Sequence, residues 1–191
     1  MAEKEFELGI KSYYFFQVSS VYYNILEPQN SNLIRKIHSM GHILGLHYDA
    51  SVHNGKNIEV LEKNLKFEIS ILQNIISDKI KIFSLHNPTT IKNIDLNNLN
   101  HSGLINASSS KLIENFKYCS DSNGYWRFDS LDKLILDENV KKLYVLTHPI
   151  WWQDKVMSPR EKIIKSISDR YNYSINSYDS LLKSHKRKNI K

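Results

Sequence analysis

Four short apolar runs in this chain end on residues that can bind metal or transfer protons. Three of them end on histidines, His47, His86 and His148, and the fourth ends on Asp121. The runs are apolar through most of their length, which is typical of strands covered on both faces in a parallel sheet. The C-terminal ends of parallel strands meet at one edge, where ligands and catalytic groups gather. We therefore expect these four side chains to surround one shared opening of an α/β protein.

Helical patterns separate the runs, so strands and helices alternate along the chain. The clearest helical pattern repeats apolar residues at three- and four-residue steps, at Leu61, Leu65, Ile69, Leu72 and Ile76. Ser31 or Asn32 can cap an earlier helix that ends at Gly41. Residues 87–110 are rich in Asn, Ser and Thr, which predicts an irregular loop.

Pro159 can open a long final helix. Its expected inward stripe consists of Ile163, Ile164, Ile167, Tyr171, Ile175, Tyr178 and Leu182. The basic segment 183–191 follows, and it is typical of a frayed, solvated helix end. A nucleic-acid patch is the other interpretation, but no recognisable binding motif accompanies it, so we expect no nucleic-acid partner.

The composition predicts one globular domain over residues 1–191, with 152–191 as a C-terminal helical extension. Hydrophobic residues make up 41% of the 191 residues and charged residues 24%. No apolar stretch is long enough to span a bilayer, and residues 1–8 lack the apolar core of a signal peptide. The single cysteine, Cys119, suits a reducing compartment, so we expect a cytoplasmic protein. Cys119 lies within an apolar run, which favours a core residue over a nucleophile.

His47 ends the first run and Asp49 lies two residues after it, so with the period of two of a strand their side chains point to the same side. An imidazole and a carboxylate on one face can bind a divalent cation such as zinc. The alternative for His47 is a hydrogen-bonded core histidine. His42, at the other end of the run, is expected to bond neighbouring backbone. His53 falls in a polar loop and is expected to be exposed.

His86 follows the second run, and Pro88 stiffens the turn behind it, which suits a positioned metal ligand or base. The segment from Asp121 to Arg127 combines a carboxylate, the aromatic plate of Trp126 and a guanidinium, groups that can contact sugar rings and hydroxyls. Alternatively, Asp121 caps the turn and Arg127 pairs with it structurally.

His148 ends the fourth run beneath a tryptophan-rich loop, which fits a general acid shielded from water. Of the adjacent Trp151 and Trp152, we expect one to cover the site and the other the core. Chemistry that depends on nucleotides or on a serine nucleophile lacks its motifs in this chain.

These motifs, in this order, resemble those of the polysaccharide deacetylase-like (NodB-homology) family, in the divergent branch associated with surface-polysaccharide biosynthesis. The segment 41–47 resembles the Gly-His-x-Ile-Gly-x-His motif, and 85–88 falls where the family has an arginine-proline motif. Residues 121–126 resemble the Asp-and-Trp motif, and 146–148 the closing Leu-x-His motif. The resemblance covers roughly residues 2–152.

The resemblance implies an incomplete, distorted (β/α) barrel that uses a divalent metal, expected to be zinc, to hydrolyse N- or O-acetyl groups of a carbohydrate substrate. It places His47, with Asp49 or His86, at the metal and makes His148 the general acid. Asp121 would orient this acid or contact substrate, and Trp126, Arg127 and Trp151 would line the sugar site.

Two departures from the family pattern accompany the resemblance. The family's second metal histidine lies four residues after the first, and Ser51 occupies that position. The family's first strand, which carries an Asp pair, is expected to precede Met1. These departures favour the alternative of a non-catalytic descendant that binds saccharide or a protein partner. The sequence indicates no oligomeric state.

Overall fold

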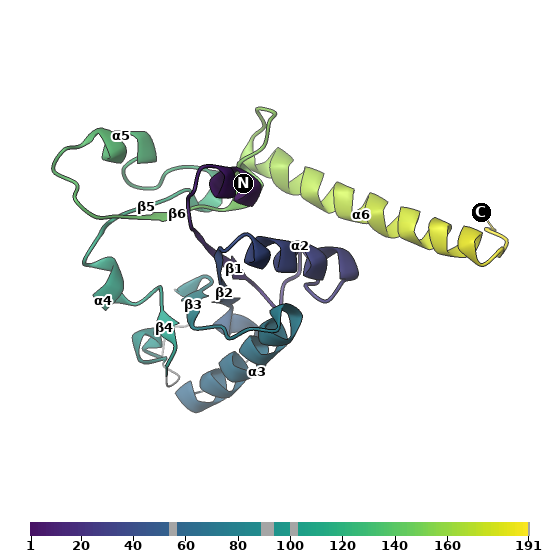
Figure 1. Cartoon of the computed structure of the whole chain (residues 1–191), viewed down its shortest axis with the longest axis horizontal. Coiled ribbons are helices and arrows are strands. Elements are labelled where there is room, and N and C mark those ends of the chain that lie inside the picture. The colour runs from purple at the N-terminus through teal and green to yellow at the C-terminus, as the bar shows by residue number, and fades with distance from the viewer. Residues whose placement is uncertain (54–56, 89–93, 100–102, 191) are drawn as a thin grey trace. The chain divides into compact units, whose positions relative to one another are not determined.

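The structure is a computed structural model that describes residues 1–53, 57–88, 94–99 and 103–190. Backbone contacts divide the chain into two compact units, Met1–Phe116 and Lys117–Lys191 (Figure 1). Each unit is described by itself below. The single domain expected from composition stays a prediction.

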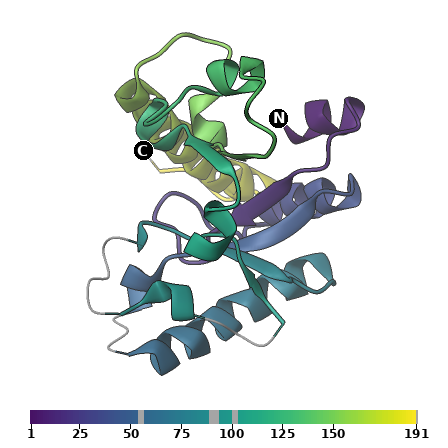
Figure 2. The ribbon, with the colours of Figure 1, turned by 90° about the vertical axis from the view of Figure 1, so that its left-hand side faces the viewer.

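Unit 1 contains a four-stranded parallel sheet in the order β1-β2-β3-β4 (Figure 2). Its strands are β1 (Tyr13–Phe16), β2 (Ile43–Tyr48), β3 (Ile82–Leu85) and β4 (Ile105–Asn106). Its helices are α1 (Ala2–Glu7), α2 (Pro28–Ser39), α3 (Ile58–Ile76) and α4 (Ser110–Ile113), with short 3-10 turns η1 (Ala50–His53) and η3 (Leu96–Asn98). Strands that follow one another in the chain therefore lie next to one another in the sheet.

The core of unit 1 lies between its sheet and the helices α2 and α3, which contact each other. The apolar stripe of α3 is buried as predicted, with Leu61, Leu65 and Leu72 fully covered. Gly45 lets β1 approach β2 closely, because a Cβ atom there would lie 2.6 Å from the ring of Phe15. Because all four strands are parallel, their C-terminal ends lie at one edge of the sheet.

Unit 2 has a second parallel pair, β5 (Lys117–Ser120) and β6 (Leu143–Leu146). Its helical segments are η4 (Ser122–Gly124), α5 (Leu131–Leu136), η5 (Pro149–Trp151) and α6 (Pro159–Ser184). Among the apolar side chains described in this unit, Cys119 and Leu134 are the buried ones. Its core is therefore much smaller than that of unit 1.

The predicted α/β class with parallel strands is confirmed, and most expected elements are present. One helix boundary was wrong: α2 begins at Pro28 rather than after Ser31 or Asn32, because proline is well suited to a first helical turn. The loop expected over 87–110 contains η3 and β4 in its described part.

Helix α6 begins as predicted, at Pro159, and Ser158 and Glu161 form a capping box there. The stripe expected to face inward is not buried, since no residue of α6 is buried. Residues 183–190 are exposed, as expected for a solvated end, and the expected fraying stays a prediction. Lys186 adopts a left-handed conformation with φ 53°, and the Arg187 amide donates to the Leu182 carbonyl at 2.8 Å, which closes the helix.

Candidate functional site

Two predicted site residues of unit 1, His47 and His86, are in contact. His47 is paired in register with Ser84 on the adjacent strand β3, and its Nδ1 lies 2.8 Å from Ser84 Oγ. His86 follows β3, and its Nδ1 lies 3.2 Å from His47 Nε2. The two rings meet edge to face with centroids 5.0 Å apart. The parallel pairing of β2 with β3 thus brings together two histidines that are 39 residues apart in sequence.

The bonds around this histidine pair form a chain that neutral imidazoles can satisfy. Asn87 Nδ2, an obligate donor, lies 3.0 Å from His86 Nε2, which must then accept. His86 Nδ1 can in turn donate to His47 Nε2, and His47 Nδ1 to Ser84 Oγ. A divalent cation between the two rings would require the His86 proton to move from Nδ1 to Nε2, with the Asn87 amide turned to present its oxygen, because a neutral imidazole binds a metal ion through its unprotonated nitrogen.

The geometry of the histidine pair suits two ligands of one divalent cation. Zinc bonds of 2.0–2.1 Å in a tetrahedral site place two ligand nitrogens about 3.3 Å apart. The separation of His47 Nε2 and His86 Nδ1 is close to this value. Ser84 would hold the other nitrogen of His47, as partners of metal-bound histidines commonly do.

Asp49 lies on the other side of His86. Its Oδ2 is 3.9 Å from His86 Nε2, the nitrogen that faces away from His47. Its Oδ1 accepts from the backbone and hydroxyl of Ser51 and so caps η1. Within the ranges that the structure describes, no three His, Cys, Asp or Glu side chains form a metal-binding group. Asp49 as a direct ligand stays a prediction, and at 3.9 Å its carboxylate is too far from His86 Nε2 for a hydrogen bond.

Asp121 and His148 form the second predicted group, in unit 2. Asp121 follows β5 and is only 4% exposed. Its Oδ1 lies 2.7 Å from His148 Nδ1 and accepts from the His148 amide at 2.9 Å, while its Oδ2 accepts from the indole of Trp152 at 2.8 Å. A buried carboxylate on Nδ1 fixes the ring orientation and leaves Nε2 of the partly exposed imidazole to face solvent or ligand.

The tryptophans near Asp121 and His148 differ in their contacts and exposure. Trp152 bonds Asp121, is about half exposed and meets Trp126 edge to face at 6.3 Å. Trp151 is partly buried, and its indole Nε1 is buried without a partner among the described residues. Arg127 is exposed. The sequence singled out Trp151 for the site, whereas Trp152 is the tryptophan in contact with the Asp121–His148 pair.

A third polar cluster, in unit 1, was missed by the sequence analysis. Glu68 of α3 is 1% exposed, and its Oε1 lies 2.7 Å from Ser19 Oγ and 2.6 Å from His53 Nε2. The prediction of an exposed His53 is therefore wrong, because it bonds this buried carboxylate and stacks on Tyr48. Glu68 lies three residues after Leu65 and four before Leu72, so its place on the apolar stripe was a readable signal.

The predictions for His42 and Cys119, both buried, agree with the contacts of these residues. His42 bonds backbone as expected, with Nδ1 accepting from the Ser12 amide at 3.3 Å and Nε2 3.0 Å from the Ala2 carbonyl oxygen. Burial, and then the charges of Asp121 and Asp129, raise the pKa of the Cys119 thiol. Cys119 is thus a poor nucleophile.

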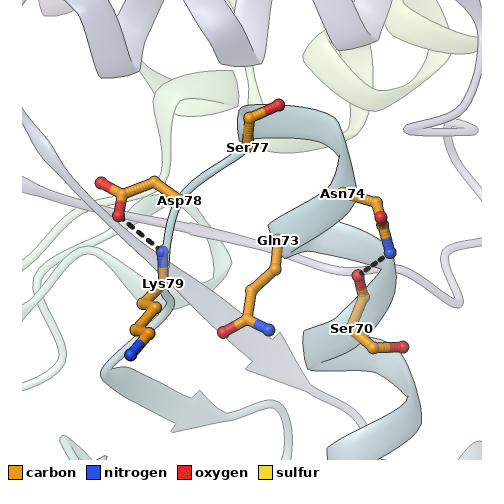
Figure 3. Close-up of a pocket in the computed structure, with 6 residues that line it drawn as sticks. All are labelled: Ser70, Gln73, Asn74, Ser77, Asp78 and Lys79. Carbon is orange, nitrogen blue, oxygen red and sulfur yellow. Dashed lines mark hydrogen bonds between the residues drawn. The ribbon is translucent and has the colours of Figure 1, made fainter.

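A surface hollow lies at the opposite end of β3 from His86 (Figure 3). It is lined by Ser70, Gln73, Asn74, Ser77, Asp78 and Lys79. Several of these polar groups bond one another or nearby backbone, such as Gln73 Oε1, which accepts from the Ile80 amide. No predicted site residue lines the hollow, and we assign it no chemistry.

No protein-family model matches this chain, and no curated protein matches it either. The shared opening expected for His47, His86, Asp121 and His148 stays a prediction.

Proposed function

We propose that this protein is a metal-dependent carbohydrate N- or O-deacetylase-like hydrolase with an incomplete, distorted (β/α) barrel. The observation that carries the proposal is the 3.2 Å contact between His47 Nε2 and His86 Nδ1 at the C-terminal ends of two adjacent parallel strands. Bound there, a divalent cation would polarise an acetyl carbonyl and lower the pKa of a water molecule.

The strand order supports the barrel part of the proposal. In a (β/α) barrel each strand pairs in parallel with the next strand of the chain. The strands β1 to β4 follow this rule, and so do β5 and β6. A doubly wound sheet, in contrast, reverses its strand order at a switch point.

His148 is the proposed general acid, and Asp121 its positioning residue. The Asp121 carboxylate holds His148 Nδ1, so the opposite nitrogen can carry a proton to the leaving amine or alcohol. Trp126, Trp152 and Arg127 lie in the same strand-end region of unit 2 and are the proposed sugar contacts.

Acetate release from acetylated chitooligosaccharides and O-acetylated xylan, with added Zn²⁺ or Co²⁺, tests this function. We expect turnover that a chelator abolishes and that His148→Gln lowers by a factor of about 10²–10⁴. His185→Gln, which alters an exposed histidine at the end of α6, is the matched control. Absence of turnover on both substrates with either metal would remove the enzymatic proposal.

A second candidate function is non-catalytic binding of saccharide or of a protein partner. It is favoured by the bonds between Ser51 and Asp49, because the family has a metal-binding histidine at the position of Ser51. Calorimetric titration with glycan fragments distinguishes the two functions. Saccharide binding that is unchanged by chelator, without turnover, supports the binding function.

A further inference from the structure

The net charge of this protein resides in its last helix and the segment after it. Residues 159–191 contain nine of the 26 Lys and Arg residues and three of the 20 Asp and Glu residues, a net charge of +6. Residues 1–158 contain 17 of each kind and are neutral overall. The whole formal charge of the chain is therefore concentrated on α6 and its tail.

The same helix has an uncovered apolar face. Residues 171–181 are all exposed, and no residue of α6 is buried. The large exposed apolar side chains on this face are Ile164, Ile167, Tyr171, Ile175, Tyr178 and Leu181. At 100° per residue they form one arc of the helix, while Lys162, Lys165 and Lys183 fall outside it. We call this set of six residues the apolar arc.

The end of the helix gathers the basic residues into a compact group. The turn at Lys186 reverses the chain, and Asn189 Nδ2 then donates to Asp179 Oδ1 at 2.7 Å. Lys183, Lys186 and Lys188 are thus held near the last turns of α6. Cations there also complement the negative end of the helix dipole.

We propose that α6 and its tail form a membrane-surface anchor that binds the anionic face of a lipid bilayer, with the apolar arc in the headgroup region. The helix suits the plane of the interface, since it combines an apolar arc, interfacial tyrosines and a basic polar face. No helix within the described ranges is apolar enough to cross a membrane. A second copy of α6 fits the arc less well, because two segments of charge +6 repel each other.

Co-sedimentation of the full chain with vesicles tests the apolar part of the proposal. We expect binding to phosphatidylcholine vesicles that contain 25–30% phosphatidylglycerol, and much weaker binding to pure phosphatidylcholine. The variant Tyr171→Glu with Ile175→Glu should reduce binding at least tenfold. Asn172→Glu with Asn176→Glu is the matched control, because it has the same charge and spacing one residue further along the helix.

The electrostatic part is tested by Lys183→Gln, Arg187→Gln and Lys188→Gln together. Each cation near an anionic surface contributes about fivefold to binding, so we expect a loss of at least tenfold. Lys63→Gln, Lys66→Gln and Lys79→Gln remove the same charge from unit 1 and should leave binding nearly unchanged. Raising NaCl from 0.1 to 0.5 M should release the wild-type protein.

Circular dichroism on each variant shows whether α6 is retained. Equal binding by the 171/175 and 172/176 variants, or equal loss in the two triple variants that remove positive charge, would overturn the proposal. Absence of vesicle binding would also overturn it. A dimer in sedimentation velocity that depends on Tyr171 and Ile175 would then indicate a second copy as the occupant of the arc, and binding to an acidic protein would indicate a protein partner.

Discussion

Asp121 illustrates how a single side chain can organise the end of a strand pair. Its carboxylate accepts hydrogen bonds from the His148 amide, the His148 ring and the Trp152 indole. The site is nearly closed to solvent. This arrangement makes it a positioning group, one of the two roles that the sequence left open for it. The capping role by itself would not explain the bond to the His148 ring.

The variant Asp121→Asn replaces one carboxylate oxygen by an NH₂ group, which cannot accept a hydrogen bond from these donors. We expect the free energy of unfolding of unit 2 to fall by about 1–3 kcal/mol, the usual cost of an unsatisfied buried polar group. Urea unfolding followed by tryptophan fluorescence measures this, because all three tryptophans lie in unit 2. Asp154→Asn, at an exposed position, is the control and should change little.

Cys119 should react slowly in the folded protein. Burial and the nearby carboxylates of Asp121 and Asp129 raise its pKa, so the thiol stays protonated at pH 8 and little thiolate is available. We expect labelling by Ellman's reagent to be at least 100-fold slower in buffer than in 6 M urea. Fast labelling of the native protein at pH 8 would contradict this assignment.

The residues of the candidate site differ in how far the sequence could predict them. The positions of His47, His86, Asp121 and His148 at strand ends follow from apolar runs that stop at polar residues. The Ser84 contact depends on strand register, which the sequence does not reveal. The choice of Trp152 over Trp151 depends on the turn of η5, which rotates only one indole toward Asp121.

At the scale of elements, α3 connects the core to the strand ends of unit 1. Its apolar stripe packs in the core, and Glu68 on the same side bonds Ser19, which follows β1, and His53, which follows β2. Burial first, and then the charge of Glu68, raise the pKa of Tyr48, whose phenol donates to the Leu61 carbonyl. One helix thus holds two loops at the edge where His47 and His86 lie.

Glu68→Ala should destabilise unit 1 strongly. It leaves the buried groups of Ser19 and His53 without their acceptor, which we expect to cost about 2–4 kcal/mol of unfolding free energy. Far-UV circular dichroism in urea measures the change. Glu62→Ala, on the same helix but only partly buried, should cost less than about 1 kcal/mol.

Element prediction succeeded where a local pattern decides the outcome. The periodicity of α3 and the proline that opens α6 are local, and both helices form as expected. Whether α6 is buried does not depend on local sequence. An amphipathic pattern identifies an apolar face but not the surface that would cover it. The two-residue strand β4 was missed because its pairing with β3 gives it an extended form that its own sequence does not signal.

At the scale of the whole molecule, the two units differ in how much apolar surface they bury. The main hydrophobic core lies entirely in unit 1, between its sheet and helices. Unit 2 depends more on hydrogen bonds such as those of Asp121. Composition alone could predict a core but not its distribution between the units.

Native-state hydrogen exchange should show this difference. Amides of β2, β3 and α3 should exchange at least 100-fold more slowly than those of β5 and β6, because opening unit 2 exposes less buried apolar surface. Mass spectrometry of peptic fragments resolves the two sets. Equal protection in both sets would contradict the expected difference in stability.

The histidine pair is the central claim of this account, and calorimetric titration of Zn²⁺ into the metal-free protein tests it most directly. We predict one site, whose affinity falls at least 100-fold in His47→Ala with His86→Ala. The control His38→Ala, which removes a surface histidine paired with Asp78, should retain the wild-type affinity. Zinc binding that is equal in all three proteins, or absent from the wild type, would contradict the assignment of His47 and His86 as a metal site.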